Sequence, residues 1–157
     1  MLREQLGQTL KTSMKEQNRR ATSTLRLILT SIKDRDIAAR GKGNAEGISD
    51  QEIAIVLQTM IRQRHESIKL FEQGGRQELA QQEAEEITII EGFLPRQLAD
   101  SEMAEAIKAT VEEIGGTGLK QVGKVMALLR ERYAGRMDFA RASATLKDEL
   151  KAREERP

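Results

Sequence analysis

A glycine-rich stretch near the carboxyl end of the chain contains most of a phosphate-binding P-loop. Gly118 is separated by four residues from Gly123 and Lys124. A working P-loop wraps backbone amides around phosphates, uses the lysine for the outer phosphates and needs a serine or threonine hydroxyl for magnesium. Val125 occupies the hydroxyl position, and residues 103–114 place apolar side chains at helical rather than strand spacing. The sequence therefore argues against a nucleotide site, and Gly123 and Lys124 need another explanation.

The amino-acid composition gives little support for a metal site or for nucleophilic catalysis. His65 is the single histidine, and the chain has no cysteine, which excludes thiolate metal sites, disulfides and cysteine nucleophiles. No second histidine motif accompanies His65 to complete a metal site or a nucleophilic triad. We therefore predict no metal, no cofactor and no catalytic residue, and we interpret His65 as an ordinary residue at the rim of an apolar helix face.

One cluster of carboxylates could still perform acid and base chemistry. The segment "QQEAEEITIIEG" places Glu83, Glu85, Glu86 and Glu91 within three turns of a helix. Paired carboxylates can act as general acid and general base, but a run of glutamates on a surface helix is also an ordinary solvated face. We favour the solvated face.

Composition indicates an all-α protein. The chain has 157 residues, of which 32% are charged, 38% hydrophobic and only 3% aromatic, and the residues that form helices well dominate. Net charge is +1 but unevenly distributed: residues 1–40 hold nine basic and four acidic side chains, residues 41–118 seven and fifteen, and residues 119–157 ten and six. The basic ends permit a polyanion partner, although ordinary solubilising surface has the same composition. No segment approaches the roughly 20 apolar residues of a membrane span and the N-terminus lacks a signal-peptide pattern, so a cytoplasmic protein without membrane contact is expected.

Four helices are predicted over residues 1–93, where they form a bundle-like domain. The first stops near Gln17 and Asn18 and buries a face that carries Leu2, Leu6, Leu10 and Met14. The second is capped by Thr22 or Ser23 and ends before Gly41. A connection this short predicts an antiparallel helical hairpin.

The third helix follows a glycine-rich loop and starts at Ser49 or Asp50, with Glu52 in the position of a capping box. It stops at residues 73–75, and the fourth helix runs from about 76 to 92. Pro95 then disfavours helical geometry, which places a domain boundary at this point.

A second, three-helix domain is predicted over residues 97–155. Ser101 caps its first helix, the glycines of 115–118 end that helix, and two further helices occupy 119–133 and 138–155. About 55 residues is close to the lower limit for independent stability.

The segment 119–141 predicts a basic helical hairpin with a net charge of +4. Gly123 falls inside a helix, where glycine costs about 1 kcal/mol relative to alanine, so we expect that another helix or a ligand backbone approaches it closely. Gly135 supplies the left-handed turn that ends this helix. Such a hairpin could bind RNA phosphates or be a solvated face, and the scarcity of aromatic partners (Tyr133 and Phe139) argues against readout of unpaired bases.

Three groups of residues are distinctive as a set: "TLRLI", "FLP" with the following "QL", and "GKVM" with its downstream Gly-Arg. Together they resemble the GatB/YqeY family, within a likeness that covers nearly the whole chain. The C-terminal half is similar to the tail domain shared with the B subunit of the glutamine-dependent tRNA amidotransferase. Thr59 departs from the family pattern, in which we expect a lysine.

The resemblance implies a helical bundle followed by a small helical domain, and kinship to the machinery that amidates misacylated tRNA. In the amidotransferase the tail domain helps to hold tRNA, and the matching positions here are Gly123, Lys124, Val125, Met126, Gly135 and Arg136. The family label is carbon–nitrogen ligase with glutamine as amido-N-donor. The large catalytic domain and the amidase subunit that this chemistry requires do not fit in this chain, and a shared tail does not confer their activity.

The sequence is compatible with three functions. The first is a tRNA-binding or amidotransferase-associated accessory protein without its own active site, with tRNA and either amidotransferase subunits or a tRNA synthetase as partners. Its predicted RNA-binding residues are Lys120, Gly123, Lys124, Arg130, Arg132, Gly135, Arg136 and Arg141. The second is a component of a carbon–nitrogen ligase that acts with missing subunits. The third is a helical protein–protein interaction module.

Overall fold

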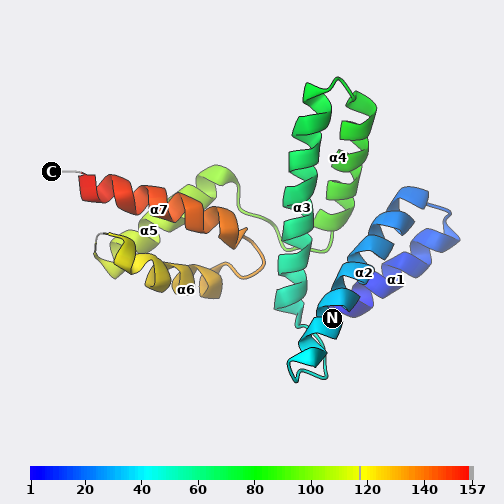
Figure 1. Ribbon diagram of the computed structural model, residues 1–157, viewed down its shortest axis with the longest axis horizontal. Helices are drawn as coiled ribbons and strands as arrows, with labels where there is room; N and C mark the ends of the chain where they lie inside the picture. Colours follow the sequence, from blue (N-terminus) through cyan, green and yellow to red (C-terminus); the bar gives the residue numbers. More distant parts are fainter. Residues whose placement is uncertain (117, 156–157) are drawn as a thin grey trace. The chain divides into compact units, whose positions relative to one another are not determined.

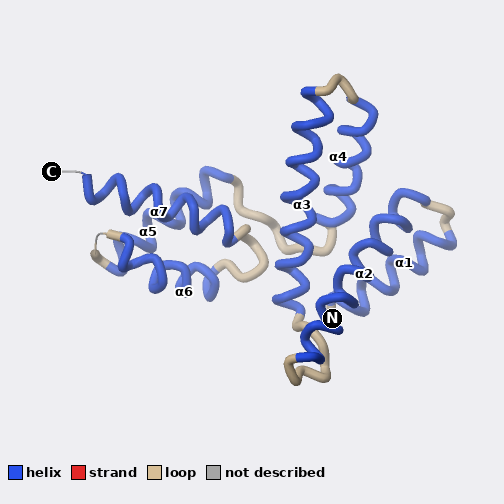
Figure 2. Tube along the Cα trace, viewed as in Figure 1, coloured by secondary structure: helices blue, strands red, loops and turns tan. Residues whose placement is uncertain are grey.

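A computed structural model describes residues 1–116 and 118–155, and this part of the chain consists of helices without a strand (Figures 1 and 2). The prediction of an all-α fold is confirmed. The helices are α1 (Leu2–Lys15), α2 (Arg19–Gly41), α3 (Asp50–Gln73), α4 (Gln77–Glu91), α5 (Asp100–Ile114), the short 3-10 helix η1 (Leu119–Gln121), α6 (Val122–Arg132) and α7 (Phe139–Glu155).

The chain forms two compact units, one from Met1 to Pro95 and one from Arg96 onward. Each unit has its own cluster of buried apolar side chains. The sequence-based division into domains at 1–93 and 97–155 is a statement about independent folding, and it stays a prediction.

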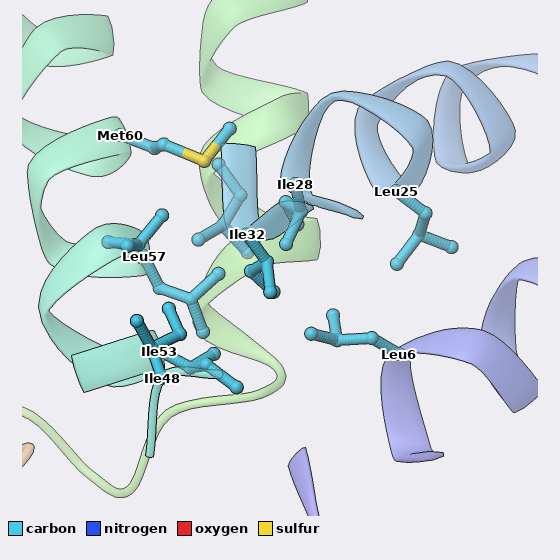
Figure 3. Close-up of a cluster of buried hydrophobic side chains, with 10 residues drawn as sticks. Leu6, Leu25, Ile28, Ile32, Ile48, Ile53, Leu57 and Met60 are labelled. Carbon is cyan, nitrogen blue, oxygen red and sulfur yellow. The ribbon is translucent and has the colours of Figure 1, made fainter. Parts of the chain in front are cut away.

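The first unit is built from two helical hairpins, α1–α2 and α3–α4, which lean together at one end (Figure 1). Its core lies at that end, where side chains from the two hairpins point toward one another (Figure 3). The core draws on α1, the middle of α2, the first half of α3 and the last turn of α4; its fully buried members include Leu6, Leu25, Ile28, Ile53, Leu57 and Ile90. Burying a side chain of this size contributes about 1.5–3 kcal/mol, so this core stabilises the packing of the two hairpins against each other.

The start of α2 differs from the prediction. Asn18, not Thr22 or Ser23, is the N-cap, and its side chain accepts a hydrogen bond from the Ala21 amide at 3.1 Å. Asparagine is among the best capping residues because its short side chain reaches the free amides of the first turn. At the other end α2 includes Gly41 as its last residue. The capping box of Ser49 and Glu52 at the start of α3 is present as predicted.

The buried face of α1 also differs from the prediction in its last turn. Met14 is 51% exposed, whereas Ser13 is buried and shares a hydrogen bond of 2.9 Å with the Thr22 hydroxyl of α2. A spacing of four residues advances about 400° around a helix, so a face that is centred on Leu6 has drifted well away from its partner by Met14. Ser13, seven residues after Leu6, is only about 20° short of two full turns and therefore lies nearer the centre of the interface.

The second unit packs α5, α6 and α7 around a separate apolar core. Its fully buried members include Ile107, Leu129, Leu146 and Leu150. The N-cap of α5 is Ala99, not Ser101, and Glu102 accepts a hydrogen bond from the Ala99 amide at 3.0 Å. The helix predicted over 119–133 is a 3-10 turn followed by α6. Thr117, in the glycine-rich turn that precedes it, lies outside the described residues.

Candidate nucleic-acid surface

The glycine-rich turn ahead of α6 is preceded by a helix, α5, as the apolar spacing predicts. Gly118 has φ +98° and ψ 167°, a backbone conformation that only glycine adopts readily and that costs other residues about 1–3 kcal/mol. The Glu154 carboxylate also lies in the space that a Cβ at this position would need. The glycine is therefore explained by the turn itself.

A substitution series follows from this turn. We expect Gly118→Ala to lower the free energy of unfolding of the second unit by about 1–3 kcal/mol because of its positive φ. Gly123→Ala is the matched control, since it lies in the first turn of α6 with open space around it and should be neutral or stabilising by up to about 1 kcal/mol. Denaturant unfolding measures both; equal effects of the two substitutions would contradict this account.

Gly123 does not have the close neighbour that we expected. A Cβ built at this position meets no atom within 4 Å, so the expectation of a tightly packed neighbouring helix is wrong. Gly123 is exposed at the start of α6, where the first backbone amides of a helix have no partner within the helix. The preceding 3-10 turn already pairs the Gln121 and Val122 amides with the Gly118 and Leu119 carbonyls, and the missing side chain leaves the backbone at Gly123 itself open to approach from solvent.

The basic residues of the 119–141 segment fall into two groups. Four are held by other side chains or by backbone within the second unit. Arg132 pairs with Glu113 through two hydrogen bonds of 2.6 and 2.7 Å, and Arg141 pairs with Asp100 at 2.7 Å. The Arg130 guanidinium lies 5.9 Å from the centre of the Phe139 ring.

Arg136, with Gly135, holds the fold of the second unit. The Arg136 Nε donates to the carbonyl of Arg96 at 3.0 Å, and the Gln97 side chain donates to the Gly135 carbonyl at 2.6 Å. The Leu98 amide also donates to the Arg136 carbonyl at 2.9 Å. Gly135 has φ +75°, the left-handed turn that the sequence predicts. These contacts fasten the segment after Pro95 to the turn between α6 and α7.

We expect Arg136→Ala to lower the free energy of unfolding of the second unit by about 0.5–1.5 kcal/mol, the net value of a typical hydrogen bond. Arg136→Lys cannot reproduce the guanidinium geometry and should recover little of the loss. Thermal unfolding followed by circular dichroism measures both variants, and a melting temperature unchanged by Arg136→Ala would exclude this structural role.

Lys120 and Lys124 form the other group. Both are exposed, and among the residues that the structure describes neither has an ion pair or a hydrogen bond from its ammonium group. They flank the open first turn of α6, whose amide ends carry partial positive charge. Of the eight predicted RNA-binding residues, these two lysines and Gly123 are therefore available for a ligand; Arg130 is exposed as well, but its guanidinium already lies against the Phe139 ring.

The glutamates of α4 are not a uniformly solvated face. Glu91 is exposed as expected, but Glu86 is only 16% exposed and accepts a hydrogen bond from Arg64 Nε at 2.9 Å. Arg20 of α2 also approaches these glutamates, and its Nε lies 3.3 Å from the Glu85 carboxylate. Burial raises the pKa of the Glu83 carboxyl, and the neighbouring charge of Glu86 raises it further. The rotation of α4 turns Glu86 toward α2 and α3, where it serves an ion-pair network between helices.

Comparison with known sequences assigns the chain to a family. The sequence profile of the Yqey-like protein family matches residues 3–150. The chain belongs to the YqeY-like family. The match extends across both compact units, as the resemblance of motifs in both halves indicates, and the relation of this family to the tail domain of the amidotransferase B subunit comes with it.

A relative of this YqeY-like chain is a protein of Kluyveromyces lactis named altered inheritance of mitochondria protein 41, mitochondrial. The two are 31% identical over 127 residues, which cover 76% of this chain and 66% of the yeast protein. The chain thus spans slightly less than two thirds of the length of that relative. The cytoplasmic location expected for this chain stays a prediction.

Two further predicted features of the YqeY-like chain are located by the structure. His65 is exposed on α3, and within residues 1–116 and 118–155 no three histidine, aspartate or glutamate side chains are grouped in a way that could hold a metal ion. None of the described helices is both long enough and apolar enough to cross a membrane. Sequence reasoning missed the roles of Arg20 and Arg64, because pairing between different helices leaves no local spacing signal.

Proposed function

We propose that this YqeY-like protein is a non-catalytic accessory protein that binds the phosphate backbone of tRNA through the surface at the start of α6. The observation that carries the proposal is the pair of exposed lysines, Lys120 and Lys124, which have no ion pair with any described residue and lie beside the open backbone at Gly123. Phosphate contacts require positive charge and backbone or side-chain donors, and they carry no base sequence. Helix N-termini add amide donors and a favourable dipole for an anion.

The proposed RNA contact involves fewer residues than the eight that the sequence predicts. Four of the predicted arginines already have partners within the second unit, so we expect them to hold this surface in place rather than to contact RNA. They are Arg130, Arg132, Arg136 and Arg141. Amidotransferase subunits or a tRNA synthetase are the protein partners that the family relation suggests for such an accessory role.

The test is a titration of fluorescently labelled tRNA, followed by anisotropy at several salt concentrations. Binding through two lysines predicts a slope of log affinity against log salt of about 1.4–1.8 from these contacts, at 0.7–0.9 per phosphate. If tRNA does not bind at low salt, this function is excluded. A carbon–nitrogen ligase component would instead be indicated by glutamine-dependent amidation in a reconstituted mixture that stops when this chain is omitted.

A further inference from the structure

The α1–α2 hairpin carries an excess of positive charge that the proposed function does not use. Residues 5–33 contain six basic side chains and one acidic side chain, Glu16. The neighbouring α3–α4 hairpin has the opposite character, with seven acidic and two basic side chains over residues 66–91. The two arms of the first unit are therefore oppositely charged.

The cations of the α1–α2 hairpin gather near its turn. The hydrogen bond between Ser13 and Thr22 sets the register of the two antiparallel helices at this level. Lys11 and Lys15 flank that level on α1, and Arg19 and Arg26 flank it on α2. At 1.5 Å of rise per residue, all four residues lie within about two helical turns of the hydrogen bond between Ser13 and Thr22.

These four cations are available to a ligand. All are exposed, and within the described residues none has an ion pair. Arg20, which lies among them, faces the carboxylates of Glu85 and Glu86 at 3.3 and 3.9 Å. One flank of the cluster therefore already attracts anionic groups from α4, and the remaining cations have no equivalent partner.

The chemistry of the hairpin favours phosphate over an apolar partner. Residues 1–40 contain no aromatic side chain, whereas protein interfaces rely on aromatic and apolar anchors and interfacial membrane helices on Trp, Phe and Leu. Met14 and Leu27 are each 51% exposed but belong to different helices, and single exposed apolar residues are ordinary surface.

We propose that the turn region of the α1–α2 hairpin, with Lys11, Lys15, Arg19 and Arg26, is a second binding surface for the phosphodiester backbone of RNA. It adds a contact in the first unit that is separate from Lys120 and Lys124 of the second unit.

The test compares three charge-matched double variants in the anisotropy titration with labelled tRNA. Lys15→Gln plus Arg19→Gln should lower the salt slope by about 1.4–1.8, the value for two phosphate contacts. Lys147→Gln plus Lys151→Gln removes the same charge from exposed positions on α7, where neither lysine has an ion pair within residues 1–116 and 118–155, and should leave the slope unchanged. Lys120→Gln plus Lys124→Gln reports separately on the proposed α6 surface.

A contact readout accompanies the affinities. Because the chain has no cysteine, Gln17→Cys can be labelled uniquely with a benzophenone maleimide, and we expect it to cross-link to tRNA. Gln73→Cys, at the turn of the acidic α3–α4 hairpin, is the control and should not. A lower salt slope of tRNA binding in the Lys15/Arg19 variant, together with cross-linking at position 17, supports the second surface whatever the result for the Lys120/Lys124 variant.

The proposal is overturned if the Lys15/Arg19 variant binds tRNA as the wild type does and position 17 does not cross-link. If only the Lys120/Lys124 variant then binds tRNA more weakly, the proposed function is supported with a single RNA-binding surface. Co-sedimentation of the protein with phosphatidylserine vesicles, without tRNA binding, would assign the basic hairpin to an anionic membrane surface and also overturn the proposal.

Discussion

Replacing Lys120 and Lys124 together by glutamine should weaken tRNA binding about 25- to 60-fold near 0.1 M salt. Each phosphate contact adds about 0.7–0.9 to the slope of log affinity against log salt, so two contacts contribute about 1.4–1.8 log units at about 0.1 M relative to about 1 M salt. Both side chains are exposed, so their removal deprives the fold of no buried contact. Anisotropy with labelled tRNA gives the affinity and the salt slope in one series.

The comparison with Lys147→Gln plus Lys151→Gln separates a local site from general charge. Both pairs are spaced four residues apart on exposed helix positions of the second unit, and both changes remove two positive charges. If the two double variants lose affinity equally, the α6 surface is not a site and RNA responds only to net charge. Circular dichroism should show the same helical content in both.

Arg136 is unsuited to such a test, although the family resemblance points to it. Its guanidinium donates to the Arg96 carbonyl, and its own carbonyl accepts from the Leu98 amide. Charge reversal at Arg136 would therefore loosen the attachment of residues 96–98 and lower RNA binding through the fold. The Gly-Arg and "FLP…QL" motifs, separated by about 40 residues in the sequence, meet in the structure for this structural reason.

The fold was predictable because helix formation leaves local signals. Apolar periodicity together with turn residues located helices α1 to α7, although not the separate 3-10 turn η1, and the Ser49–Glu52 capping box fixed the start of α3. Errors occurred where two local signals competed: Asn18, Thr22 and Ser23 are all good caps, and only the geometry of the turn selects Asn18. The drift of Met14 out of the interface similarly depends on where α2 lies.

The candidate site was predictable only as a list of charges. The sequence identifies six basic residues between 119 and 141, but ion pairing with Glu113 and Asp100 depends on how α5 packs against α6 and α7. Gly123 shows the same limit, because a glycine in an open first turn and a glycine under a packed helix have the same sequence signal. Three-dimensional partners decide which cations are available.

Leu129→Ala should have the largest effect on stability, about 2–5 kcal/mol, the range for removing a buried leucine side chain from a core. Leu129 is fully buried in the core of the second unit, among Ile107, Val125 and Leu146. The hydrophobic core of a domain of fewer than about 70 residues rarely supplies more than about 3–5 kcal/mol of net stability. The substitution should therefore unfold the second unit in a large fraction of molecules.

Hydrogen exchange followed by mass spectrometry locates this loss. If the units fold independently, amides of α5, α6 and α7 lose protection in Leu129→Ala while those of α2 and α3 keep it, because the core around Leu57 is separate. Leu119→Ala is the control: that leucine is 56% exposed, and its truncation should change stability by less than about 0.5 kcal/mol. Equal loss of protection in α2 and α3 would show that the chain unfolds as one cooperative domain and that the predicted division at 1–93 and 97–155 is wrong.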